Sequence, residues 1–175
     1  MSLPARTGAV AAAAVLAVAL SAPVLGAGAL MAPCKGSQLT GSFRVIPGSA
    51  GAGNIVYRLR VVNATSKSWF VTGIPTLTLL DRVGHKLPTK STFSGPPGTL
   101  SAVIVPPAKG EIASLTARFS PDVPGPGEQV TGPCEKTAYK LRVGPSGGGA
   151  IVVPIGPPTA VCEHGSLQLS VFTAS

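Results

Sequence analysis

Glycine and proline recur at short intervals along the whole chain: 22 of its 175 residues are glycine and 18 are proline. Both residue types weaken the interior of a helix and favour turns. The composition therefore excludes a coiled coil or a helical bundle, which needs Ala, Glu, Lys and Leu at helical spacing. Disorder is also disfavoured, because 45% of the residues are hydrophobic.

The segments between these turns alternate apolar and polar residues, as strands with one buried face do. Such segments are expected at 38–46, 54–62, 69–72, 76–81, 99–105, 111–119, 137–143, 150–153 and 166–172. In the clearest of them, 54–62, Ile55, Tyr57, Leu59 and Val61 alternate with Val56, Arg58 and Arg60. The pattern predicts an all-β fold, an immunoglobulin-like β-sandwich of about eight or nine short antiparallel strands. A closed barrel is the alternative.

The first 32 residues have the three regions of a secretory signal. A basic start with Arg6 is followed by an uncharged stretch with a short apolar helix, which Pro23 interrupts, and then by the small residues Ala27-Gly28-Ala29. We expect residues 1–32 to be a signal peptide and 33–175 to be a single β-sandwich domain. An uncleaved N-terminal membrane anchor is the alternative, because the uncharged stretch is long enough to span a bilayer. Lipidation of Cys34 is disfavoured, because Pro33 stands where a lipobox needs a small residue.

Three cysteines, Cys34, Cys134 and Cys162, follow the predicted signal. Outside the cytoplasm such residues usually pair, and three leave one over. A Cys134–Cys162 bond would close a predicted hairpin, whereas a Cys34–Cys162 bond would tie the first strand to the last. Spacing does not decide between the pairings. Metal ligation is not expected, because there is no Cys-x-x-Cys pair and His164 alone does not complete a ligand set.

Few residues could carry acid–base chemistry, since the chain has six acidic residues and two histidines, His85 and His164. It has no Gly-x-Ser-x-Gly elbow and no phosphate-binding loop. We therefore expect no enzyme, no catalytic residue, no cofactor and no metal. A rival hypothesis is an accessory or catalytic domain of an extracellular hydrolase, with His85 or His164 beside a carboxylate and a serine. A second rival is a purely structural module.

The chain is strongly basic, because 14 Lys and Arg against 6 Asp and Glu give a net charge of +8. This excess of positive charge suggests that the protein binds a polyanion. Arg58 and Arg60 share the polar face of one strand and are predicted to form a polyanion-binding surface. Other cations could add to it, namely Arg44, Lys67, Arg82, Lys86, Lys90, Lys140 and Arg142. The segments 88–98 and 120–133 are expected to be long loops that contact partners.

These features together predict an exported, secreted or envelope-associated module that binds an anionic cell-wall polymer or an envelope protein. Nucleic acid is not an expected partner, because the basic residues lack interleaved aromatics. Contact with a membrane is expected only if the N-terminal segment is uncleaved.

Several short motifs follow one another in a recognisable order. They are Cys34, Gly51-Ala52-Gly53, Asn63-Ala64-Thr65, Gly73-Ile74-Pro75, Asp81-Arg82-Val83-Gly84, Pro106-Pro107-Ala108-Lys109-Gly110, Cys134 and Cys162. In this order the chain resembles a family of secreted, mostly actinobacterial domains, the domain of unknown function number 4232. The resemblance spans nearly all of residues 33–175 and implies no activity, because the family has no established one.

The chain departs from the family pattern at one position. The family usually has a second Cys shortly after the Asn-x-Ser/Thr turn, where this chain has Trp69-Phe70. If the family pairs its cysteines in order, the resemblance implies a Cys134–Cys162 disulfide and an unpaired Cys34. Trp69 would then pack where the missing bond would have been.

Overall fold

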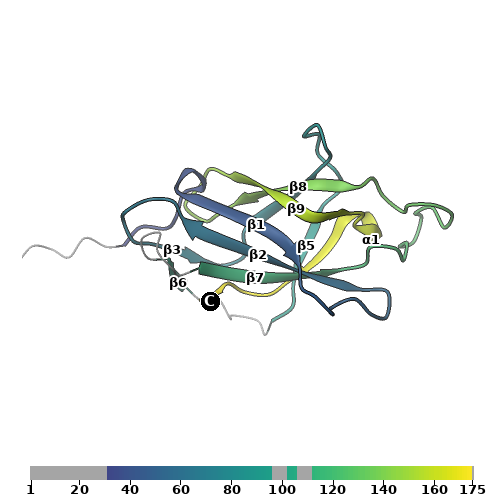
Figure 1. Ribbon diagram of the computed structural model, residues 1–175, viewed down its shortest axis with the longest axis horizontal. Coiled ribbons are helices and arrows are strands. Elements are labelled where there is room, and N and C mark those ends of the chain that lie inside the picture. The colour runs from purple at the N-terminus through teal and green to yellow at the C-terminus, as the bar shows by residue number, and fades with distance from the viewer. Residues whose placement is uncertain (1–30, 96–101, 106–111, 175) are drawn as a thin grey trace, which may run out of the picture.

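The computed structural model describes residues 31–95, 102–105 and 112–174, and these are mostly β (Figure 1). The strands are β1 (Leu39–Val45), β2 (Ile55–Asn63), β3 (Trp69–Thr72), β4 (Thr76–Leu80), β5 (Lys90–Phe93), β6 (Ala102–Val105), β7 (Ile112–Phe119), β8 (Ala138–Gly144), β9 (Ile151–Thr159), β10 (Ser166–Leu169) and β11 (Thr173–Ala174). A short 3-10 turn, η1 (Gly36–Gln38), precedes β1, and a single turn, α1 (Cys162–Gly165), precedes β10.

Nearly all of the predicted signal peptide or membrane anchor, residues 1–30, lies outside the described residues. Within the described ranges, no helix has the length and apolar character needed to cross a membrane.

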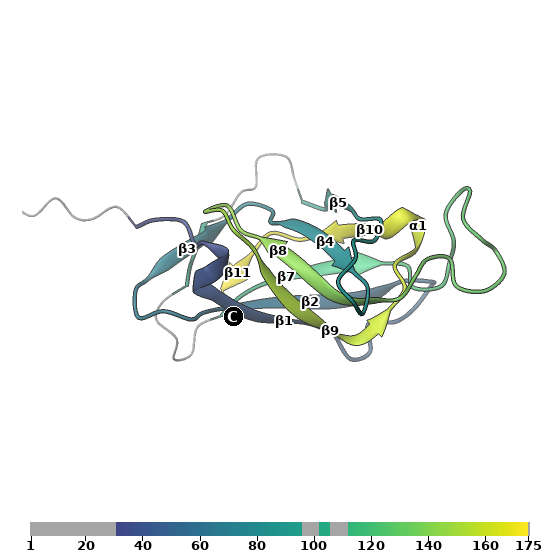
Figure 2. The ribbon, with the colours of Figure 1, turned by 90° about the horizontal axis from the view of Figure 1, so that it is seen from above.

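Hydrogen bonds join nine strands into one mixed sheet with the order β4-β8-β9-β1-β2-β7-β10-β5, and β11 pairs with β7. The two ends of this sheet approach each other through the segment that leads into β5. Leu87 N donates to Leu79 O at 2.9 Å, and Leu79 N donates to Thr89 Oγ1 at 2.9 Å. The sheet is therefore nearly closed into a barrel (Figure 2). Strands β3 and β6 form a separate two-stranded sheet.

The sheet confirms the predicted β class, but its connectivity differs from the expected antiparallel sandwich. Strand β1 is parallel to β9, and β5 is parallel to β10, so the expectation of antiparallel strands is wrong for these two pairs. Both parallel pairs join strands far apart in the sequence, whereas the hairpin β1–β2 is antiparallel. The direction of a distant strand depends on how the chain crosses the molecule, and the alternation of residues along one strand carries no information about it.

Two strands lie where loops were expected. Strand β5 occupies part of the segment 88–98, which was predicted to be a loop, and it pairs with β10 from Lys90 to Phe93. Strand β9 continues to Thr159, past the expected end at 153, although it contains Pro154, Pro157 and Pro158. These segments lack strong strand patterns of their own, so partners supplied by the tertiary structure decide their conformation.

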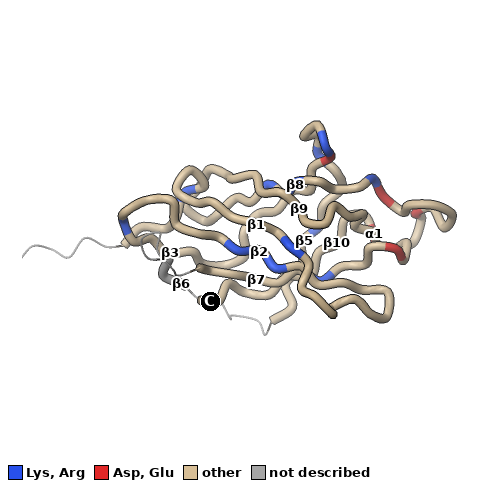
Figure 3. The backbone as a smooth tube through the Cα atoms, viewed as in Figure 1, with Lys and Arg blue, Asp and Glu red and all other residues tan. Residues whose placement is uncertain are grey.

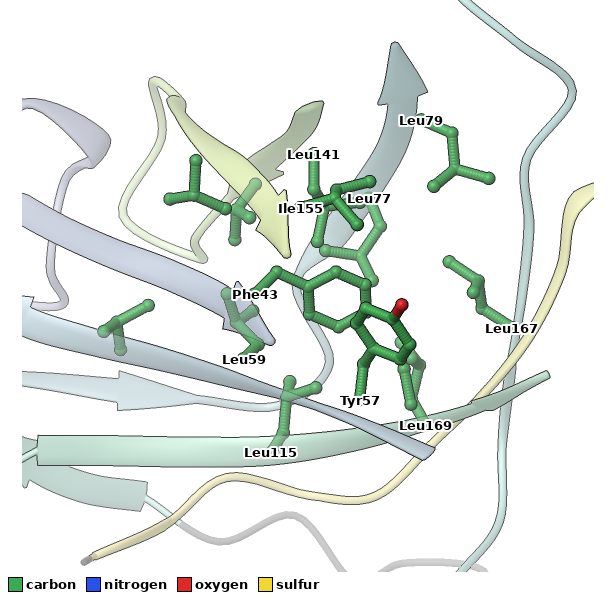
Figure 4. Close-up of a cluster of buried hydrophobic side chains, with 14 of the residues drawn as sticks. Phe43, Tyr57, Leu59, Leu77, Leu79, Leu115, Leu141, Ile155, Leu167 and Leu169 are labelled. Atoms are coloured by element: carbon green, nitrogen blue, oxygen red, sulfur yellow. The ribbon is translucent and has the colours of Figure 1, made fainter. Parts of the chain in front are cut away.

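The core fills the inside of the curled sheet with side chains from nearly every strand (Figure 4). Strand β2 has the predicted alternation: Tyr57, Leu59 and Val61 are buried, while Arg58 and Arg60 are exposed. The ring of Tyr57 lies between those of Phe43 and Phe119, at centroid distances of 5.1 and 5.2 Å. Burial of this kind stabilises the fold by about 25 cal/mol per Å² of apolar surface, and it fixes which face of β2 meets solvent.

The Asn63-Ala64-Thr65 motif forms the turn between β2 and β3. Asn63 is buried, and its Oδ1 accepts hydrogen bonds from the backbone N and the Oγ1 of Thr65, both at 2.8 Å. The indole Nε1 of Trp69 donates to the same Thr65 Oγ1 at 2.8 Å. The motif therefore fixes the turn and orients Trp69 against the core.

Candidate functional site

Four arginines project from the outer surface of three adjacent strands, and we call this group the basic face: Arg44 of β1, Arg58 and Arg60 of β2, and Arg118 of β7. Arg44 lies directly opposite Arg58 in the β1–β2 register, and Arg118 lies opposite Val56 in the β2–β7 register. All four residues are exposed. The sheet thus brings cations from three strands onto one surface, which shows as a group of blue segments in Figure 3.

The basic face carries uncompensated charge. Within the described residues no Lys or Arg forms an ion pair, since every ion pair there involves a histidine. Of the described acids, Asp81 lies in the turn after β4, whereas Asp122, Glu128, Glu135 and Glu163 lie in the 120–137 segment and α1. Glu163 lines a hollow of about 250 Å³ together with Arg118 but forms no ion pair with it, and Figure 3 shows red segments mainly at the end of the molecule near α1. Like charges on opposed residues of neighbouring strands disfavour the sheet, so the pairing of Arg44 with Arg58 carries a local energetic cost.

Two hollows adjoin the basic face. One, of about 280 Å³, is lined by Ser42, Arg44, Val45, Ile46, Pro47, Arg58 and Arg60. The other, of about 340 Å³, is lined by Thr40, Gly41, Ser42, Arg60, Val62 and Ile112. They share Ser42 and Arg60, so Arg60 stands between them. Glycine also lets Arg44 lie against β9, because a Cβ at Gly156 would come within 2.9 Å of the Arg44 Nη1.

The structure brings only some of the expected cations to the basic face. Arg44 joins Arg58 and Arg60, and so does Arg118, which the sequence places on the polar side of strand 111–119. Arg82 instead stacks on Tyr139, with its Cζ 4.5 Å from the ring centroid and its Nη2 2.9 Å from the hydroxyl. Lys140 and Arg142 lie on β8, which β9 and β1 separate from β2. The remaining candidates are elsewhere: Lys67 in the turn after β2, Lys86 in the segment after β4, and Lys90 on β5.

The two histidines lie in different turns, each beside a carboxylate. The Asp81 carboxylate accepts backbone hydrogen bonds from Val83, Gly84 and His85 at 2.7–3.0 Å and lies 3.2 Å from His85 Nδ1. Burial raises the pKa of Asp81, but the His85 and Gly84 N–H donors and the His85 side chain outweigh it and hold the pKa below its ordinary value. The arrangement stabilises a turn. No described Ser or Thr hydroxyl is hydrogen-bonded to either histidine ring.

His164 belongs to a second cluster, which forms where α1 meets the 120–137 segment. Its Nδ1 lies 3.6 Å from Glu128 Oε1 and 3.8 Å from Glu135 Oε1, and its Nε2 lies 3.1 Å from Pro126 O. The Glu128 side chain is 2% exposed. Its carboxylate accepts backbone hydrogen bonds from Gly125 at 2.6 Å, from Glu163 at 2.8 Å and from His164. These donors outweigh the effect of burial, which raises the Glu128 pKa, and hold that pKa below its ordinary value.

The turn α1 is left-handed: φ is +57° at Glu163, +57° at His164 and +76° at Gly165. Residues other than glycine rarely adopt this conformation, which costs about 1–2 kcal/mol each. Here the Glu128 carboxylate compensates by accepting the N–H groups of Glu163 and His164. Sequence reasoning assigned no role to Glu128 or Glu135, because they lie far from His164 along the chain and no local motif connects them.

The cysteines are arranged as the family resemblance implies. Cys134 and Cys162 form a disulfide with a Cα–Cα distance of 5.5 Å, and Cys34 is free and buried. Burial raises the pKa of the Cys34 thiol to about 11. The backbone N of Cys34 donates to Phe70 O at 2.8 Å, so the unpaired cysteine lies beside β3, the strand that begins at Trp69.

Of three comparisons with known proteins, one identifies the family of this chain. A search of curated proteins and a search of solved structures each found no match. The family model of a domain of unknown function, DUF4232, matches residues 34–173, a range that contains all three cysteines and the strands from β1 to β10. The chain therefore belongs to the DUF4232 family.

Proposed function

We propose that the protein is a non-catalytic binding module of the extracytoplasmic space, and that its basic face binds an anionic polymer of the cell wall. The observation that carries this proposal is the grouping of Arg44, Arg58, Arg60 and Arg118 on one sheet surface, where none of them forms an ion pair within the described residues. Four such charges produce a positive potential that attracts polyanions. The long guanidinium side chains suit phosphate and carboxylate groups, which they can bind through paired hydrogen bonds.

Two further observations support an extracytoplasmic role. The Cys134–Cys162 disulfide is typical of proteins that fold in an oxidising compartment. The first 32 residues have the composition of an export signal. Separately, we propose that the curled sheet is an immunoglobulin-like sandwich in which β4 and β8 face β7 and β10 across the shared core.

The test is co-sedimentation of the purified protein with isolated cell-wall sacculi across a salt series. Saturable binding that weakens as salt rises is expected, because exposed charges are screened over about 10 Å at 0.1 M salt. Each arginine near an anionic surface contributes about 1 kcal/mol. Replacing two of them, as in R58E/R60E, should therefore weaken binding by about 2 kcal/mol or more, roughly 30-fold.

Arg142→Glu provides the matched control. It reverses one charge, as R58E or R60E does singly, at an exposed strand residue, but on β8 and away from the basic face. We expect R142E to bind almost as well as the unaltered protein. The proposal fails if no binding occurs at any salt concentration, or if R142E weakens binding as much as either substitution on β2.

A further inference from the structure

We propose that Glu128, Glu135 and His164 form a binding site for a divalent transition-metal cation, with Zn²⁺ as the best fit. One ligand atom from each residue lies within 4.8 Å of the other two, and His164 Nδ1 approaches both Glu128 Oε1 and Glu135 Oε1. This site is separate from the basic face and does not depend on the function proposed above.

The first argument is the orientation of the imidazole. His164 Nε2 lies 3.1 Å from the carbonyl oxygen of Pro126. A carbonyl can only accept a hydrogen bond, so Nε2 must carry the hydrogen. In the neutral ring Nδ1 then presents its lone pair, and it faces the two carboxylate oxygens. A lone pair directed at two anionic oxygens is unfavourable, so either a proton on Nδ1 or a cation must lie between them, and the proposal is that a cation does. A backbone carbonyl that holds the far ring nitrogen is also the usual support of a metal-binding histidine.

The second argument is distance. Zn²⁺ binds nitrogen and carboxylate oxygen at about 2.0–2.2 Å in tetrahedral geometry, which places its ligand atoms roughly 3.4 Å apart. The two nitrogen–oxygen distances here, 3.6 and 3.8 Å, exceed this value only slightly. Small movements of the side chains would therefore bring all three ligands to bonding distance.

The third argument is that the surrounding structure holds these ligands in place. The Glu128 side chain is almost fully buried and is fixed by the N–H groups of Gly125, Glu163 and His164. Glu135 directly follows Cys134, and His164 lies two residues after Cys162. The disulfide therefore sets how far Glu135 lies from His164. Preorganised ligands of this kind lose little conformational freedom when a metal binds.

Access and charge also suit a cation. Glu135 lines a hollow of about 460 Å³ together with Gln129, Pro133, Cys134, Lys136 and Thr137, and the His164 side chain is 59% exposed, so an ion and its water can reach two of the three ligands from solvent. Two carboxylates and a neutral imidazole carry a charge of −2, which one divalent ion balances. Lys136 is the unfavourable neighbour, but its side chain is exposed and able to turn away. The nitrogen ligand favours Zn²⁺ over Ca²⁺ and Mg²⁺, which prefer oxygen.

The experiment is a calorimetric titration of the tag-free protein, disulfide intact and without reductant, with Zn²⁺. We expect one ion per chain. Glu135→Gln and His164→Asn each remove one ligand and should weaken binding by more than the roughly 10- to 100-fold that loss of an outer-shell partner costs. Asn is chosen at 164 because it tolerates the left-handed backbone better than most residues. The controls are Glu163→Gln, whose exposed carboxylate is not a ligand, and His85→Gln, which removes the other histidine; both should bind normally.

A second readout identifies the ligand atom. In ¹⁵N-detected NMR, Zn²⁺ should shift the His164 Nδ1 resonance and leave the His85 resonances unchanged. The proposal is overturned if the native protein binds no Zn²⁺, which would mean that the cluster holds a protonated imidazole instead. It is also overturned if E135Q and H164N bind Zn²⁺ as the native protein does, or if Ca²⁺ binds as tightly as Zn²⁺.

Discussion

Removing the Cys134–Cys162 disulfide should destabilise the protein by an amount that follows from the closed loop. The bond joins residues 28 positions apart. The loop-entropy relation for a crosslink of this span gives about 3.6 kcal/mol at 25 °C, most of it from restriction of the unfolded chain. The Cα–Cα distance of 5.5 Å lies in the ordinary range for disulfides, so the folded backbone accommodates the bond.

The perturbation is the double substitution C134A/C162A, which leaves Cys34 as the one remaining thiol and so permits no other internal bond. Alanine is preferred to serine because Cys162 is buried and a hydroxyl there would need a partner. Urea unfolding can be followed by the fluorescence of Trp69, the single tryptophan, which packs against the core. We expect a loss of about 3–4 kcal/mol and a Tm lower by roughly 10–15 °C.

The urea dependence provides an internal check. Without the bond the unfolded chain expands and exposes more surface, so the m-value should rise while the free energy falls. A loss below about 1 kcal/mol with an unchanged m-value would refute the reasoning. It would mean that contacts persisting in the unfolded state already restrain the 134–162 segment.

Three further predictions concern the unpaired cysteine and the turn carboxylates. Cys34 should resist iodoacetamide in the folded protein, because its thiol is buried and has a pKa raised to about 11. One thiol per chain should react after denaturation. Fast labelling of the folded protein, detected by mass spectrometry, would contradict this. Val71→Cys should form a disulfide with Cys34, because Pro33 pairs with Phe70 in parallel and the next residues, Cys34 and Val71, are both buried; two free thiols after oxidation would disprove that register. The free energy of unfolding measured in urea should decline as pH falls below about 4.5, because Glu128 and Asp81 have lowered pKa values in the folded state and their contribution is lost on protonation. Glu128→Gln should flatten this decline. A pH profile identical to that of the native protein would contradict a stabilising role for the Glu128 carboxylate.

The fold shows where local pattern is sufficient and where it is not. The alternation in β2 predicted that Tyr57 and Leu59 are buried and that Arg58 is exposed, because successive side chains of a strand point to opposite faces. The same rule placed Arg118 on the polar side of its strand. The position of β5 was not predictable, because Lys90–Phe93 is polar and becomes a strand only by pairing with β10.

The candidate sites also have some features that the sequence predicts and others that only the tertiary structure sets. The sequence by itself determined the charge of the protein, the exposed side of Arg58 and Arg60, and a set of three cysteines suited to one disulfide. Only the tertiary structure decided that Arg44 lies opposite Arg58, because register is a property of two strands together. Only the tertiary structure brought Glu128 and Glu135 to His164. That meeting requires a left-handed turn, a buried carboxylate and a crosslink between distant segments, and no stretch of the chain encodes all three locally.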